Sequence, residues 1–136
     1  MKFRGLMYCV LDDRGDTRGG SFILPDEWLT ILPAVQDIHI TTLRPGHVRG
    51  NHYHAHRREL IIVVHADRWS LHWDSGANTR VVSQGFEGSG AVSIAVLPNM
   101  SHAIRNDGSL DLQLMALSDV AYTSTNPDTH SRAVVT

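Results

Sequence analysis

Histidines crowd one short segment of the chain. The sequence holds nine histidines in 136 residues, and His52, His54 and His56 occupy alternate positions, followed by Glu59. On a strand, residues two apart project from the same face, so His52 and His54 would present two imidazoles side by side. Glu59 can turn its carboxylate toward the same point, and His102 supplies a fourth candidate ligand from far along the chain. Three imidazoles and one carboxylate suit zinc, iron, nickel or manganese, so we expect one divalent metal ion per chain, of undetermined identity.

The same histidines could instead transfer protons, because imidazole titrates near neutral pH. If His52 and His54 bind a metal, they are not free to act as bases, and His56 or Tyr122 becomes the candidate catalytic acid or base. If no metal binds, His52 and His54 are themselves the candidate acid and base. The two mechanisms exclude each other, and the sequence leaves both open.

Three further residues are candidates for substrate binding: Arg49, Asn51 and Trp73. The guanidinium of Arg49 could hold a diphosphate or a carboxylate through two parallel hydrogen bonds. Arg49 is an odd number of positions from His52, so a regular strand would point the two side chains to opposite faces. A bulge or a kink at Gly50 is needed to bring Arg49 to the same side. Trp73 could form an aromatic wall for the substrate or simply pack in the core.

Short strands are expected to position these groups. Val, Ile and Thr total 29 residues, whereas Lys and Glu total four, a balance that favours strands over helices. The apolar runs and turn residues predict strands over residues 3–11, 38–43, 60–64, 68–73, 79–83, 92–97 and 112–117. The segment from Pro25 to Leu32 predicts one helix of about two turns, since a proline and two acidic residues open it and Pro33 closes it. His39 and His47 could line the mouth of the barrel, but we expect them at surface or edge positions.

Composition narrows the class of protein. The length suits a single domain, which we divide into an N-terminal strand, loop and helix (1–37), a core barrel (38–118) and a tail (119–136). A net charge of −2 offers no electrostatic footprint for nucleic acid. The only cysteine, Cys9, excludes an internal disulfide and a multi-cysteine zinc site, and a Schiff-base mechanism would rest on the only lysine, Lys2. The longest apolar run, Leu60 to Val64, is too short to span a membrane, and we see no signal peptide, so we expect a cytoplasmic protein.

The histidine segment resembles the first motif of the cupin superfamily, in which a glycine precedes His-x-His and a glutamate follows. Gly46, His52, His54 and Glu59 match this motif, while Ala66 stands where the family has its closing glycine. The second cupin motif ends in a histidine followed by an asparagine, which His102 and Asn106 match. Asn99 stands where that motif has a glycine. Asparagine tolerates a left-handed backbone better than most residues, so the substitution is physically mild.

A closer resemblance covers residues 44–135. The string from Pro45 to His54, and the ending Asn126-Pro127-Asp128-Thr129, are similar to the C-terminal cupin half of bifunctional capsular-polysaccharide enzymes. In those enzymes this half epimerises an NDP-4-keto-6-deoxy sugar. The deoxysugar 3,4-ketoisomerases carry a related Arg-Gly-x-His-x-His, whose two histidines are held to act as acid and base without metal.

These resemblances imply an all-β protein, a double-stranded β-helix (the cupin jelly-roll barrel) with one short N-terminal helix. They imply inward-facing ligands at His52, His54, Glu59 and His102, a homodimer, and a small-molecule substrate, with neither nucleic acid nor membrane as a partner. The function they favour is epimerisation or isomerisation of an NDP-4-keto-6-deoxy sugar. Two alternatives stay open: an iron-dependent oxygenase or another tailoring enzyme, and a non-catalytic cupin that binds a ligand.

Overall fold

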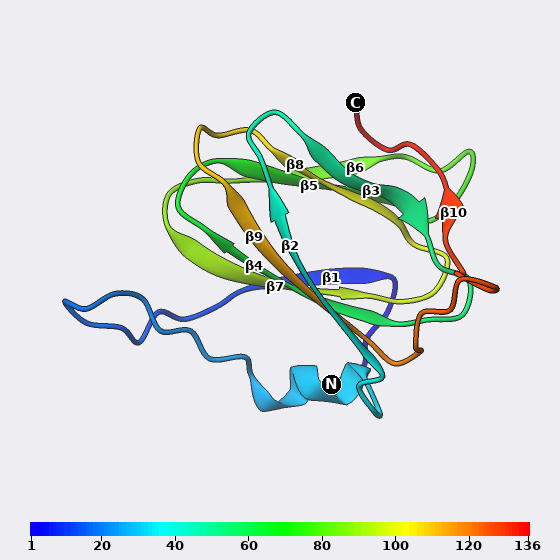
Figure 1. Ribbon diagram of the computed structural model, residues 1–136, viewed down its shortest axis with the longest axis horizontal. Coiled ribbons are helices and arrows are strands. Elements are labelled where there is room, and N and C mark those ends of the chain that lie inside the picture. Colours follow the sequence, from blue (N-terminus) through cyan, green and yellow to red (C-terminus); the bar gives the residue numbers. More distant parts are fainter.

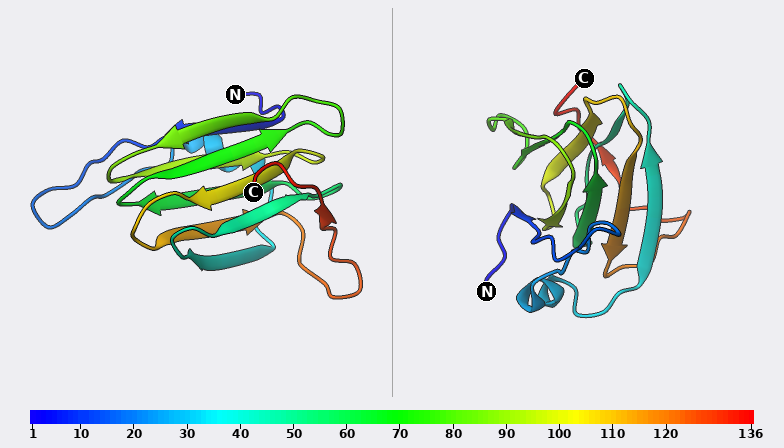
Figure 2. Two further views of the ribbon diagram at one scale, coloured as in Figure 1. Left: turned by 90° about the horizontal axis from the view of Figure 1, so that it is seen from above. Right: turned by 90° about the vertical axis from the view of Figure 1, so that its left-hand side faces the viewer.

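The chain folds into two antiparallel five-stranded sheets that face each other, as the computed structural model of residues 1–136 shows (Figures 1 and 2). The first sheet has the order β1-β7-β4-β9-β2 and the second β10-β3-β8-β5-β6. The strands are β1 (Leu6–Val10), β2 (Asp37–Leu43), β3 (Val48–Tyr53), β4 (Glu59–His65), β5 (Trp69–Asp74), β6 (Val82–Phe86), β7 (Gly90–Val96), β8 (Ser101–Asn106), β9 (Leu112–Ser118) and β10 (His130–Ser131). The expected all-β architecture is confirmed.

The short N-terminal helix is not confirmed, because the structure contains no α-helix. Residues Asp26–Ile31 form instead a six-residue 3-10 helix, η1, without a side-chain cap. So short a segment, closed by Pro33, is too brief for a stable α-helix, and its shape follows tertiary packing. Trp28 and Ile31 are buried in a small apolar cluster against the outer face of the first sheet. None of the helical structure has the length and apolar character needed to cross a membrane.

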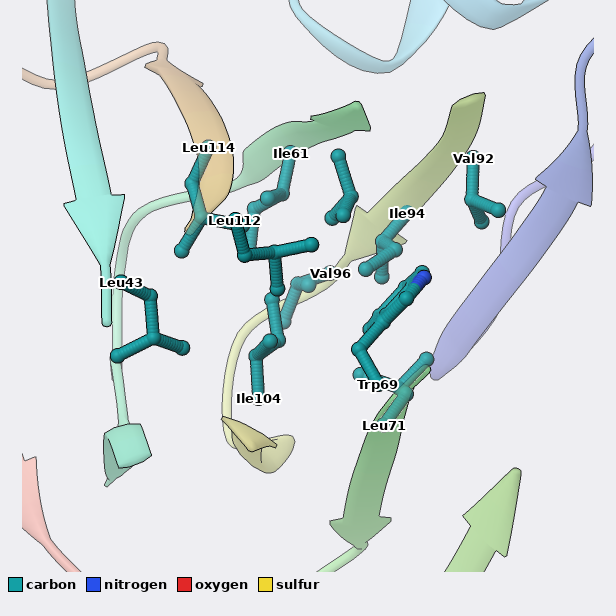
Figure 3. Packing of buried hydrophobic residues seen from close by; sticks show 11 residues of the cluster. Leu43, Ile61, Trp69, Leu71, Val92, Ile94, Val96, Ile104, Leu112 and Leu114 are labelled. Atoms are coloured by element: carbon teal, nitrogen blue, oxygen red, sulfur yellow. The ribbon is translucent and has the colours of Figure 1, made fainter. Parts of the chain in front are cut away.

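The apolar core occupies the space between the two sheets (Figure 3). Eleven buried residues form it, and they come from both sheets: Leu43, Ile61, Val63, Trp69, Leu71, Val92, Ile94, Val96, Ile104, Leu112 and Leu114. Alternation along each strand decides which residues enter it. In β4 the inward row runs Glu59, Ile61, Val63, and in β8 it includes His102 and Ile104. A polar site therefore begins where the apolar core ends.

Two central strands of the second sheet were absent from the predicted set. β3 and β8 pair with each other, and β8 also pairs with β5. β6 begins three residues later than the expected run at residue 79. The sheets also recruit β1, which pairs with β7, and β10, which pairs with β3. Both lie outside residues 38–118, where we expected the core barrel.

Candidate metal centre

Four polar side chains meet at one end of the barrel. His52 lies in β3, Glu59 begins β4, His102 lies in β8, and His54 directly follows β3. One potential ligand atom from each residue lies within 4.8 Å of the others. Glu59 Oε1 is 2.8 Å from His54 Nε2 and 3.5 Å from His102 Nε2. The structure therefore brings together the four residues that the sequence nominates as metal ligands.

The orientation of two of the imidazoles is fixed by backbone carbonyls. His54 Nδ1 lies 2.6 Å from the carbonyl oxygen of Asp128, and His102 Nδ1 lies 2.9 Å from that of Met100. A carbonyl only accepts, so each Nδ1 carries a proton, and each Nε2 is the nitrogen that faces Glu59. Metal-binding histidines in proteins are oriented in this way.

The donor atoms fit a metal ion. His54 Nε2 and Glu59 Oε1 are buried, and neither makes a hydrogen bond of good geometry, although they lie 2.8 Å apart. Buried polar atoms without partners cost free energy, and an ion between them would satisfy both. Three imidazole nitrogens and one carboxylate oxygen form a donor set used by several divalent transition metals.

The ionisation of the site also suits metal binding. Burial lowers the pKa of His52 to about 4, and the neighbouring His102 and His54 act in the same direction, so His52 is neutral at pH 7. Burial alone would lower the pKa of His54, but the adjacent Glu59 carboxylate outweighs it and raises that pKa. Burial alone would raise the pKa of Glu59, but His102 and His54 beside it lower it well below its usual range. Glu59 and His52 are therefore in the forms that coordinate metals, whereas His54, whose pKa is raised, must give up its proton when an ion binds.

The turn after His54 is held by one carboxylate from the C-terminal segment. Asp128 Oδ1 accepts a hydrogen bond from the Ala55 amide at 2.9 Å, and Oδ2 accepts from the amides of His56 at 2.9 Å and Arg57 at 3.2 Å. The Arg57 guanidinium in turn donates to the carbonyl of Pro127 at 3.2 Å. Asp128 therefore contacts His54 through its main chain and the following turn through its side chain. The sequence does not indicate this role, because Asp128 stands out there only as part of the Pro-Asp-Thr ending shared with the capsular enzymes.

A bulge in β3 brings Arg49 to the same side as the histidines. Arg49 pairs with Ile104 and His52 with His102, and the register shifts between Gly50 and His52. Because of this extra residue, the Arg49 side chain points inward, whereas strict alternation along the strand would point it outward. Gly50 has φ 104°, and a Cβ there would lie 2.6 Å from the carbonyl oxygen of His102. Only glycine suits this position.

The cluster opens onto a cavity of about 390 Å³ between the sheets. Its polar lining includes His39, Thr41 and Arg49, together with His52, Glu59 and His102 of the cluster. A second hollow of about 600 Å³ shares Val48 and Arg49 with it and is lined further by Arg44, His47 and Asp111. His39 lies on edge strand β2 as expected, and it also lines the cavity, which is the alternative that the sequence left open.

The remaining predicted site residues lie outside this cavity lining. Asn51 binds the C-terminal segment: its Oδ1 accepts from the amides of Val134 and Val135, and its Nδ2 donates to the Val135 carbonyl. Trp73 faces inward as the cross-strand neighbour of His102, and its ring packs edge-on against Tyr8. His56 and Tyr122 are exposed, in the turn after β3 and in the segment after β9, respectively.

A comparison with known proteins shows the family to which this chain belongs. The family model for the polysaccharide biosynthesis C-terminal domain matches residues 15–130, a range that contains all four clustered residues. The chain belongs to this family. Asn99, which replaces a glycine of the second cupin motif, adopts φ 69°, so it takes the left-handed backbone that asparagine was expected to tolerate. A comparison with curated proteins gave no match.

Solved structures share the fold. The capsular polysaccharide assembling protein CapF from Staphylococcus aureus is 18% identical with a TM-score of 0.66; the match covers 91% of this chain and 34% of CapF, so this chain spans about a third of that protein. The 3,4-ketoisomerase QdtA from Thermoanaerobacterium thermosaccharolyticum is 12% identical with a TM-score of 0.65, covering 94% of this chain and 88% of QdtA. A dTDP sugar isomerase from Desulfovibrio desulfuricans is 10% identical with a TM-score of 0.75, covering 96% and 85%. The resemblance to the cupin half of the capsular enzymes and to the ketoisomerases is confirmed at the level of the fold.

Proposed function

We propose that this protein is a metal-binding cupin enzyme that epimerises or isomerises an NDP-4-keto-6-deoxy sugar. The observation that carries the proposal is the cluster of His52, His54, Glu59 and His102, with ligand atoms within 4.8 Å, at a cavity that Arg49 also lines. Membership of the polysaccharide biosynthesis C-terminal domain family supports a role in polysaccharide biosynthesis. The QdtA structure was solved in complex with TDP-4-keto-6-deoxyglucose, which supports a nucleotide-linked keto sugar as the substrate class here.

The cavity provides suitable contacts for such a substrate. Arg49 lines both hollows, and Arg44 and His47 line the outer one. A guanidinium binds phosphate oxygens through paired hydrogen bonds, so Arg49 and Arg44 are suited to the diphosphate. The sugar would then extend inward, toward the metal ligands. The apolar floor formed by Ile61, Ile104 and Leu114 would exclude water from the reacting carbons.

His52, His54, Glu59 and His102 would hold the ion. A bound divalent cation supplies Lewis acidity, which polarises a carbonyl and stabilises the negative charge that develops on its oxygen. The carbonyls of Asp128 and Met100 keep the Nε2 atoms of His54 and His102 directed at that position. Without an ion, His52 and His54 would be left to act as acid and base, the second mechanism that the sequence allows.

The first test is elemental analysis of untagged protein purified without chelator. We expect about one metal ion per chain, lost in His52→Ala and His102→Ala and retained in His47→Ala, a histidine outside the cluster. Absence of metal after reconstitution with zinc, iron, nickel and manganese would overturn the metal part of the proposal. Iron together with oxygen consumption would favour the oxygenase alternative.

The second test follows the proposed reaction. The protein is incubated in D₂O with a dTDP-4-keto-6-deoxy sugar, and we expect deuterium to enter the carbon next to the carbonyl. A protein that binds the sugar nucleotide but incorporates no deuterium would contradict the isomerase and support a ligand-binding cupin. A homodimer and a cytoplasmic location remain predictions; light scattering of the purified protein tests the first.

A further inference from the structure

The proposed reaction needs a proton-transfer group that is not bound to metal. With His52, His54 and His102 engaged as ligands, the base must come from elsewhere in the cavity. The two candidates named from the sequence, His56 and Tyr122, do not line it. Apart from the ligands, only His39 and Arg49 among the lining residues are titratable. A guanidinium stays protonated in proteins and is a poor base, which leaves His39.

His39 lines the same cavity as the proposed ligands His52, Glu59 and His102. In the first sheet, His39 of β2 pairs with Ala116 of β9, which pairs in turn with Ile61 of β4, so all three side chains share the inward face. Two strand spacings separate the backbones of His39 and Ile61 by roughly 10 Å. The small side chain of Ala116 between them leaves this part of the sheet open. A sugar ring can therefore lie between the His39 imidazole and the ligand cluster.

The imidazole of His39 has a carboxylate partner on its own strand. His39 Nε2 lies 3.2 Å from Asp37 Oδ2, and Asp37 is two residues earlier on the same inward-facing row. The paired carboxylate holds the ring and stabilises the imidazolium that forms when the ring takes a proton. The His39 side chain is 59% exposed, so its proton can exchange with water at the cavity mouth.

We propose that His39 is the acid–base residue of this site and that Asp37 is its positioning residue. The inference rests on the proposed function. His39 would accept the proton from the carbon next to the carbonyl while the electron pair of the C–H bond moves into the carbonyl to form an enolate. Return of a proton to that carbon, from the imidazolium or from solvent water on the opposite face, restores the ketone. The step needs no oxidant or reductant.

Deuterium incorporation into the dTDP-4-keto-6-deoxy sugar tests this role in the metal-loaded protein. We expect His39→Asn to lower the rate by about 100-fold or more, the usual size of a general-base contribution, with metal content and melting temperature unchanged. Ile40→Asn is the matched control, since it places the same new residue on β2 at an exposed position on the opposite face, outside both hollows. His39→Gln provides a second variant if His39→Asn fails to fold.

Asp37→Asn should lower kcat and leave KM close to that of the wild type, and Asp37→Glu should restore part of kcat. A general structural defect would not produce this pattern. A His39→Asn variant that exchanges as fast as Ile40→Asn would overturn the inference and leave the proposed function intact. A wild-type protein that binds the sugar nucleotide without any exchange would instead overturn the proposed function, and the role of His39 with it.

Discussion

Removal of the Asp128 carboxylate should loosen the turn that follows His54. The carboxylate accepts three backbone hydrogen bonds, from the amides of Ala55, His56 and Arg57. A hydrogen bond to a charged group contributes about 1.5–3 kcal/mol, and we count one in full for the buried residue Arg57. The other two amides can turn to water and contribute less. We therefore expect Asp128→Gly to lower the free energy of unfolding by about 3 kcal/mol.

Three substitutions at Asp128 distinguish the contribution of the carboxylate to stability from that of the backbone conformation. Asp128 has φ 47°, a left-handed conformation that costs about 1 kcal/mol for alanine and little for glycine or asparagine. Asp128→Ala should accordingly be less stable than Asp128→Gly by about 1 kcal/mol. Asp128→Asn keeps the backbone tolerance but turns an NH₂ group toward at least one amide donor, so it should fall between the wild type and Asp128→Gly.

Urea unfolding of the metal-free proteins measures these differences, and chelator competition measures metal affinity. Because the Asp128 carbonyl orients His54, we expect metal affinity to fall by about 10–100-fold in Asp128→Gly. An Asp128→Asn variant as stable as the wild type, or an Asp128→Gly variant destabilised by less than about 1 kcal/mol, would refute the assignment of this carboxylate as the element that holds the turn.

Further predictions follow from other parts of the structure. The Arg132 guanidinium lowers the pKa of Asp74, so this pair stabilises the fold above about pH 4 and loses its contribution as the pH falls through the folded-state pKa; Asp74→Asn should flatten the acid limb of a plot of urea midpoint against pH. Gly50→Ala places a Cβ against the carbonyl of His102 and should destabilise the protein by more than about 3 kcal/mol in the same assay. Trp69→Ala empties a buried core position and should cost about 3–5 kcal/mol, measured by calorimetry; a loss below 1 kcal/mol would contradict the packing described. Chelation of the metal-loaded protein should lower its melting temperature, whereas apo protein should melt unchanged when chelator is added.

Apolar alternation made most of the first sheet predictable. Ile61 and Val63 in β4, and Leu112 and Leu114 in β9, are apolar residues whose side chains all enter the core. β3 and β8 lack this signal, because their inward positions include His52 and His102 instead of aliphatic side chains. The polar residues that make the site are thus the reason why its strands were hard to recognise.

Local signals predicted the clustered residues better than the residues that support them. His52 and His54 lie two residues apart, so strand geometry alone indicates a common face for them, and Glu59 follows after a short turn. Asp128 contacts this turn from more than 70 residues away, and no spacing rule connects them. His39 was expected at an edge, which is correct. Its position facing the cavity depends on the pairing of β2 with β9. For the 3-10 helix the local signals were misleading. Its proline and acidic residues do open a helical segment, but that segment is too short to nucleate an α-helix.

The bulge in β3 sets the chain's tolerance to insertions and deletions. Arg49, before the bulge, and His52, after it, both face inward although they are three positions apart in the sequence. The extra residue in the bulge makes this possible. Deleting Asn51 would leave Arg49 and His52 two positions apart, a spacing at which a regular strand points both side chains to one face. The guanidinium and the imidazole would then both face the barrel without a bulge. Strand length and the bulge are therefore coupled here: a homologous chain one residue shorter in this segment can keep both groups only if it also lacks the bulge.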